Sequence, residues 1–131
     1  MAIGSILIID DEVHLRRNLQ ILLSRAGYTV VTAMDGTEGL QCLQHAHFDV
    51  ILTDLVMDGN SGLEILEGLV AYAPETPVIV ITGYASAALA NEAFCRGAYD
   101  YITKPFQLEV IKSSIASALE KKRHSRHVGP A

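Results

Sequence analysis

The 131-residue sequence has few cysteines, no long apolar run and no charged N-terminal segment. Its two cysteines, Cys42 and Cys95, lie in helical patterns without a metal-ligand set nearby. We therefore expect free, buried or half-buried thiols in a reducing cytoplasm. No apolar run approaches the roughly 20 residues that span a bilayer, and Met1-Ala2-Ile3-Gly4 lacks the charge of a signal peptide. These absences predict a cytoplasmic chain without membrane contact.

Basic residues are scarce outside the last stretch of the chain. Four of the ten Lys and Arg lie in residues 121–131, which contain no acid, so residues 1–120 carry six bases against fifteen acids and a formal charge of about −9. Contacts to nucleic-acid phosphates need a basic surface. We therefore expect no direct nucleic-acid contact by this domain. The division we predict is one domain over residues 1–120 and a basic tail or linker over 121–131.

Several motifs of enzyme active sites are also missing. The sequence has no Gly-rich phosphate loop, and no serine or cysteine lies on a recognisable nucleophile elbow. The five histidines show no metal-ligand spacing. Any chemistry must therefore come from other side chains.

What the chain does have is a regular alternation of short apolar runs with helical patterns. Five runs are typical of strands, and they cover Ser5–Asp10, Tyr28–Ala33, Asp49–Thr53, Val78–Thr82 and Tyr99–Thr103. Strands that alternate with helices favour an α/β fold, with a parallel sheet covered by helices on both faces.

The helix boundaries carry recognisable signals. The first helix is expected to end at Gly27, and the fourth covers Ser86–Arg96. Asp35-Gly36-Thr37-Glu38 and Ser61-Gly62-Leu63-Glu64 both have the form of a capping box, an acceptor followed three residues later by a glutamate. Between the third strand and the second box we expect a loop over residues 55–60. The last amphipathic helix is expected to lose its pattern past Glu120.

Acidic side chains follow two of the predicted strands at the points where these strands end. Asp10 and Asp11 follow the first strand, and Asp54 follows the third. Because parallel strands gather their carboxyl ends at one sheet edge, we expect the three carboxylates to lie together. Adjacent like charges resist ionisation unless a cation such as Mg²⁺, which prefers oxygen ligands, offsets them. A simpler interpretation makes Asp11 the N-cap of the first helix and leaves Asp10 solvated.

Asp54 is our candidate nucleophile. A carboxylate can attack phosphorus and form an acyl phosphate, provided that a metal and a cation offset the negative charges. Thr82 ends the fourth strand and Lys104 follows the fifth, so a hydroxyl and an ammonium are expected at the same edge. Pro105 stops the strand ladder and favours a cis peptide bond after Lys104. Taken singly, Thr82 and Lys104 have ordinary alternatives, a β-branched strand residue and a surface lysine.

This set of motifs resembles the receiver domain of two-component response regulators, a flavodoxin-like (βα)₅ module. The resemblance covers about residues 3–120 and rests, in chain order, on Asp10-Asp11, Asp54, Thr82-Gly83, Gly97-Ala98-Tyr99-Asp100-Tyr101 and Lys104-Pro105-Phe106. It implies a five-stranded parallel sheet with strand order 2-1-3-4-5. One departure is Met57-Asp58, where many receivers have Met-Pro.

The resemblance implies a phosphoacceptor and a metal site. Asp54 is then the residue that takes a phosphoryl group from a sensor histidine kinase or a phosphotransfer protein. Asp10, Asp11 and Asp54, with the backbone carbonyl of Val56, are then the ligands of a Mg²⁺ cofactor. A protein of this kind is not an enzyme acting on a separate substrate, because it catalyses only its own phosphoryl transfer and dephosphorylation.

The resemblance also implies a switch. Thr82 and Lys104 would contact the phosphoryl group, and Thr82 would pass the change to the switch residue Tyr101. Receivers often dimerise or bind partners on the face formed by the fourth helix, fifth strand and fifth helix. Here Tyr99 and Tyr101 are expected on one face of that strand, so we expect the output surface, and homodimer contacts, there.

Two other classes of function stay open. A small Mg²⁺-dependent aspartyl-phosphate phosphatase would be expected to carry Asp-x-Asp after its first strand, whereas Asp10 and Asp11 are adjacent. A phosphate-independent interaction scaffold would be expected to have lost Lys104 or one of the acids, and all of them are present.

Overall fold

The computed structural model describes residues 3–57, 60–84 and 86–127, which form alternating strands and helices. Five parallel strands make the main sheet, and two short antiparallel strands pair separately. In chain order the elements are β1 (Ser5–Ile9), α1 (Val13–Arg25), β2 (Thr29–Ala33), α2 (Gly36–His45), β3 (Val50–Thr53), β4 (Val56–Met57), β5 (Asn60–Ser61), α3 (Gly62–Tyr72), β6 (Val78–Thr82), α4 (Ala87–Cys95), β7 (Asp100–Thr103) and α5 (Leu108–His127).

The order of the parallel strands is β2-β1-β3-β6-β7, which is the predicted order 2-1-3-4-5 of a flavodoxin-like α/β fold. In the register of β1 against β3, Ile9 lies opposite Thr53. The next residue of each strand therefore leaves the sheet at the same level. In the register of β6 against β7, Thr82 lies opposite Thr103. The sheet thus brings residues from four strands to one carboxyl edge.

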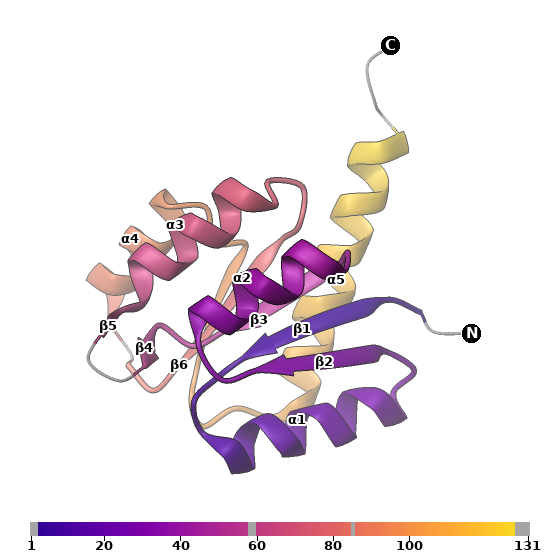
Figure 1. Ribbon diagram of the computed structural model, residues 1–131, viewed down its shortest axis with the longest axis horizontal. Coiled ribbons are helices and arrows are strands. Elements are labelled where there is room, and N and C mark those ends of the chain that lie inside the picture. Colours follow the sequence, from indigo (N-terminus) through magenta and orange to yellow (C-terminus); the bar gives the residue numbers. More distant parts are fainter. Residues whose placement is uncertain (1–2, 58–59, 85, 128–131) are drawn as a thin grey trace.

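Helices cover the sheet on both faces, and the central strands are buried on both sides. Successive residues of β1 alternate between two apolar clusters. Ile6 and Ile8 pack in the cluster that includes α1 and α5, while Leu7 and Ile9 pack in the cluster that includes α2, α3 and α4. Figure 1 shows α2 and α3 side by side on one face, with α1 on the other. This double cover explains the continuously apolar strand sequences.

The first capping box forms as predicted, with one shift in its return bond. The Asp35 carboxylate accepts a hydrogen bond of 2.8 Å from the backbone amide of Glu38 and caps α2. The Glu38 carboxylate accepts from the amide of Met34, at 3.2 Å, one residue before the cap. The backbone amides of Met34 and Glu38, before and after Asp35, therefore both donate to a side-chain carboxylate.

The segment after β3 differs from the prediction. Instead of a loop over residues 55–60, Val56 pairs with Ser61 and Met57 with Asn60 in a short hairpin. Ser61, the expected cap of the next helix, lies in β5, and α3 begins at Gly62. Asp58, at the departure from the usual Met-Pro, lies outside the described residues.

The last helix is longer than its apolar pattern. The pattern ends near Glu120, but α5 continues to His127 (Figure 1). The extra turns contain no Gly or Pro that would break the helix. Among the described residues, none of the helices has the length and apolar character needed to cross a membrane. Of the two free cysteines, which we expected to be buried or half-buried, Cys42 is half-buried but Cys95 is exposed.

Candidate functional site

Two buried carboxylates lie side by side at the carboxyl edge of the sheet. Asp10 is 3% exposed and Asp54 is 7% exposed. The backbone amide of Asp54 donates to the carbonyl of Ile9, at 3.0 Å, so the ends of β1 and β3 are tied together. One oxygen of Asp10 accepts a 2.9 Å hydrogen bond from the amide of Glu12. The N-cap of α1 is Glu12, so the simpler interpretation of Asp11 as N-cap and Asp10 as solvated is wrong.

A single lysine joins the two acids. The Lys104 ammonium donates to Oδ2 of Asp54 at 2.8 Å and to Oδ2 of Asp10 at 3.1 Å. Its side chain is 22% exposed, so these ion pairs lie largely out of water. The backbone amide of Lys104 donates to the Thr82 carbonyl at 2.7 Å, and the bond between Lys104 and Pro105 is cis, as the sequence predicted. Lys104, which lies far from Asp10 and Asp54 in the sequence, thus places its positive charge beside both carboxylates.

Burial and the neighbouring charges shift the pKa values of the site residues. Burial raises the pKa of the Asp10 carboxyl, and the Asp54 charge adds to the rise, against the hydrogen bond from Glu12 and the Lys104 charge. Burial alone lowers the pKa of the Lys104 ammonium, but the hydrogen bonds and charges of Asp54 and Asp10 outweigh it and raise the pKa overall. Lys104 therefore stays protonated while it neutralises only one of the two negative charges.

The donor set fits a hard divalent cation. Asp10, Asp11 and Asp54 each offer a carboxylate oxygen, and these oxygens lie within 4.8 Å of one another. Asp11 is exposed, which leaves an approach from solvent to the two buried acids. Three carboxylates beside one ammonium leave an excess of negative charge that a divalent cation relieves, and all-oxygen ligation suits Mg²⁺. Val56, the expected carbonyl ligand, begins β4 two residues after Asp54.

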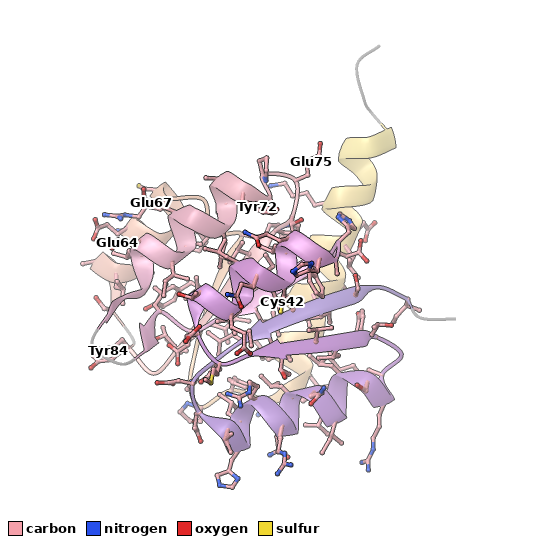
Figure 2. All side chains as sticks on the ribbon, in the orientation of Figure 1. Cys42, Glu64, Glu67, Tyr72, Glu75 and Tyr84 are labelled. Atoms are coloured by element: carbon pink, nitrogen blue, oxygen red, sulfur yellow. The ribbon has the colours of Figure 1, made fainter. Side chains whose placement is uncertain are left out.

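A hydrogen-bonded chain leads from the site towards α4. Thr82 is fully buried, and its hydroxyl accepts from the backbone amide of Tyr84 at 3.3 Å. The carbonyl of Tyr84 accepts from the phenol of Tyr101 at 2.6 Å. Burial, helped by the Asp54 charge, raises the pKa of Tyr101, so the phenol keeps the proton that it donates. Figure 2 shows Tyr84 at the periphery of the molecule, where the residue is 58% exposed.

Tyr99 and Tyr101, which we expected on one face of the fifth parallel strand, do not share a face. Tyr101 packs with the cluster that includes α4. Tyr99 packs with the opposite cluster, and its hydroxyl lies 2.7 Å from that of Ser117 on α5. Strand alternation does not apply to this pair because β7 begins at Asp100, so Tyr99 lies before the pleated segment.

Two residues near the site had been missed. Arg16 donates from Nη1 to the backbone carbonyl of Asp10 at 2.7 Å, and the Glu12 amide holds the Asp10 carboxylate. A signal for Arg16 was present in the sequence. A cation in the first turns of a helix lies near the positive end of the helix dipole, which is unfavourable. Its presence there suggests that the side chain has a compensating acceptor elsewhere.

Comparison with known proteins gives the family. Residues 6–116 match the model of the response regulator receiver domain. The chain is 38% identical over 118 residues to the uncharacterized transcriptional regulatory protein YkoG of Bacillus subtilis, covering 90% of this chain and 52% of YkoG. It is 35% identical over 122 residues to the C4-dicarboxylate transport transcriptional regulatory protein DctD of Rhizobium meliloti, covering 93% of this chain and 26% of DctD. The chain thus spans about half to a quarter of the length of these relatives.

Solved structures agree with the family model. A response regulator receiver domain protein from Clostridium thermocellum superimposes with a TM-score of 0.86 at 33% identity, covering 92% of this chain and 98% of that one. NtrX from Brucella abortus superimposes with a TM-score of 0.90 at 33% identity, covering 98% of this chain and 29% of NtrX. Because the family model matches most of its length, this chain belongs to the response regulator receiver domain family.

Proposed function

We propose that Asp54 accepts a phosphoryl group from the phosphohistidine of a sensor histidine kinase or a phosphotransfer protein, with Mg²⁺ as cofactor. One observation carries the proposal. In a chain of the receiver family, Lys104 contacts the buried carboxylates of Asp54 and Asp10 at the carboxyl edge of the sheet. Such a set supplies a nucleophile, a metal ligand and a fixed cation within hydrogen-bonding reach.

The transfer step is a displacement at phosphorus. An oxygen of Asp54 forms a bond to phosphorus while the bond from phosphorus to the imidazole nitrogen breaks, and the imidazole leaves with the bonding electron pair. Lys104 offsets negative charge on the transferring group, and its raised pKa keeps it charged. Asp10, Asp11, Asp54 and the Val56 carbonyl are the proposed ligands of Mg²⁺, which would supply further neutralisation of negative charge when bound. Hydrolysis of the acyl phosphate later restores the carboxylate.

The proposed switch runs through Thr82. Its hydroxyl accepts from the Tyr84 amide and keeps its own hydrogen to donate, so donation to a phosphoryl group on Asp54 would pull the oxygen that holds Tyr84 towards the site. A shift of Tyr84 changes the carbonyl that accepts from Tyr101. We propose that phosphorylation biases a two-state equilibrium of this chain and alters the face formed by α4, β7 and α5. That face would then bind a partner or a second copy of the domain.

The remaining assignments follow from charge and composition. We propose residues 1–120 as the receiver domain and 121–131 as a basic tail or linker, although Lys121 still touches the body, with its ammonium 5.4 Å from the Tyr99 ring centre. The acidic body supports a domain that makes no direct contact with nucleic acid. The two free cysteines support a cytoplasmic location.

The test is phosphorylation by a small donor. The protein is incubated with Mg²⁺ and acetyl phosphate or phosphoramidate, and its intact mass is measured. We expect a gain of one phosphoryl group, which disappears in Asp54→Asn, a variant of nearly the same shape. Undiminished labelling of Asp54→Asn would refute the assignment of the phosphoacceptor.

A further inference from the structure

Two helix glycines lie directly behind the residues that flank the buried acids. Gly39, on α2, faces Ile9, which immediately precedes Asp10. A Cβ at Gly39 would overlap Cδ1 of Ile9 and lie 3.0 Å from its Cγ1. Ile9 is fully buried in the sheet, so its side chain has little space into which it can move.

The position of Ile9 affects both acids. Asp10 is the next residue of the chain, and the Ile9 carbonyl accepts the hydrogen bond from the Asp54 amide. A shift of Ile9 therefore moves one acid through the backbone and the other through that hydrogen bond.

Gly62 lies behind the second acid in the same way. A Cβ at this first residue of α3 would overlap the backbone carbonyl of Leu55, which immediately follows Asp54. Leu55 is buried. The pairing of Val56 with Ser61 closes the segment between Leu55 and Gly62 into a hairpin. Because the overlap is with backbone, no change of side-chain rotamer relieves it.

We infer that Gly39 and Gly62 are positioning residues for the acidic site. Their lack of side chains lets α2 and α3 pack against Ile9 and Leu55 so that Asp10 and Asp54 converge on Lys104. The inference deepens the proposed function and rests on it. Gly68, also on α3, shows the contrast, because a Cβ there would meet nothing within 4 Å. Gly68→Ala is therefore a matched control for the same substitution in the same helix.

The experiment measures Mg²⁺ affinity and acetyl phosphate labelling in the folded variants. Stability is a poor readout, because Gly→Ala in a helix also adds up to about 1 kcal/mol of helix propensity. We expect Gly39→Ala and Gly62→Ala to weaken Mg²⁺ binding on the order of tenfold, as residues that orient metal ligands do, and to slow labelling. Gly68→Ala should keep the wild-type affinity and rate.

A rescue separates positioning from general damage. Ile9→Val removes the Cδ1 atom that a Cβ at Gly39 would overlap, so Gly39→Ala with Ile9→Val should regain the Mg²⁺ affinity of Ile9→Val alone. Leu55→Ala should not rescue Gly62→Ala, because that overlap is with backbone. If Gly62→Ala does not fold, the Gly39 and Ile9 variants decide. Wild-type affinity in Gly39→Ala, or a loss that persists after Ile9→Val, overturns the inference.

A second readout is independent of phosphorylation. In metal-free protein, the amide chemical shifts of Asp10 and Asp54 should change more in Gly39→Ala than in Gly68→Ala. If wild-type protein takes no label, the proposed function fails, and these shifts still test the placement of the acids. Equal shifts in the two variants overturn the inference even where the wild type is labelled.

Discussion

The two edges of the parallel sheet carry ionisable residues in different ways. At the carboxyl edge, Asp10 and Asp54 are buried, and the half-buried Lys104 donates a hydrogen bond to each of them. At the opposite edge lies an open cavity of about 540 Å³, lined by residues from the end of α2 and from the connection between α3 and β6. Tyr72 and Glu75, labelled in Figure 2, belong to this lining. His47 there is 61% exposed, at 3.7 Å from Asp49.

Both edges of the sheet have charged groups. The edges differ in whether these groups lie close together and in whether they are buried. Strand register fixes the acids of the carboxyl edge within reach of one another, and burial removes the water that would screen them. At the opposite edge His47 and Glu75 follow helix ends and are exposed to water, and an ion pair with an exposed partner contributes little to stability. Within the described ranges, only Asp10, Asp11 and Asp54 bring three potential metal ligands together. Substitutions at the two edges should therefore have unequal effects.

The largest expected effect is on metal binding. Asp11→Ala removes a charged ligand and should weaken Mg²⁺ binding by about tenfold or more, because a charge-assisted contact is worth at least about 1.5 kcal/mol. Glu75→Ala removes an acid at the opposite edge and should leave the affinity unchanged. Calorimetric titration with Mg²⁺ compares the two. An equal loss in both variants would mean that the binding reflects overall charge and not the site.

The next effect concerns the link from the site to its output face. Thr82→Ala should still be phosphorylated, because Asp54, Asp10 and Lys104 are intact, but it lacks the hydroxyl that engages Tyr84. With Mg²⁺ and beryllofluoride, an acyl-phosphate mimic, we expect amide shifts at Tyr101 and α4 in wild type and less than about half of those shifts in Thr82→Ala. The link is wrong if Tyr101 is unmoved in wild type or shifts equally in both proteins.

A smaller effect is on stability without metal. The folded pKa of Asp10 lies above its ordinary value of 3.8, so the folded state binds more protons between these two pKa values. The free energy of unfolding therefore falls as pH rises from 3.8 through the folded pKa of Asp10. Asp10→Asn should remove that part of the pH dependence and gain about 0.5–2 kcal/mol at neutral pH in EDTA.

Urea unfolding measures this change, with the same titration in Mg²⁺ as the control. Bound metal stabilises only the wild-type folded state at full affinity, so the advantage of Asp10→Asn should shrink. A lower stability of Asp10→Asn in EDTA would contradict the destabilisation that we assign to the buried charge of Asp10.

The smallest effect is at Arg16. Its hydrogen bond to the Asp10 carbonyl is half-buried, so Arg16→Ala should cost about 1 kcal/mol of unfolding free energy. Arg17→Ala, at the exposed neighbour on α1, should cost less than about 0.5 kcal/mol. Thermal unfolding of both variants checks the difference. Equal losses of unfolding free energy in the two variants would mean that the hydrogen bond from Arg16 to the Asp10 carbonyl does not stabilise the protein.

Much of the fold was predictable because the signals were strong and redundant. Each buried strand was a continuous apolar run, and polar residues followed it at a fixed place. Since parallel strands share one carboxyl edge, the meeting of Asp10 with Asp54 was predictable from their places at the ends of two strands, and the observed register brings the two ends to the same level. The roles of these residues in phosphoryl transfer stay predictions until they are measured.

Other features had no readable signal. Strands of two residues, such as β4 and β5, are too short to show a period, so the hairpin after Leu55 looked like a loop. Alternation placed Tyr99 beside Tyr101, but the strand begins one residue later and Tyr99 turns to α5. The helical extension beyond Glu120 carries no apolar pattern, although nothing in it breaks a helix.

The central claim is that Asp54, one of the two buried acids at the carboxyl edge, accepts the phosphoryl group. The direct measurement is to map the label after treatment with acetyl phosphate and Mg²⁺. Borohydride reduces an aspartyl phosphate to homoserine, which a peptide mass spectrum locates. The account predicts homoserine at position 54 in the wild type and none elsewhere. Homoserine at another position, or a label that survives reduction on a serine, threonine or histidine, would contradict it.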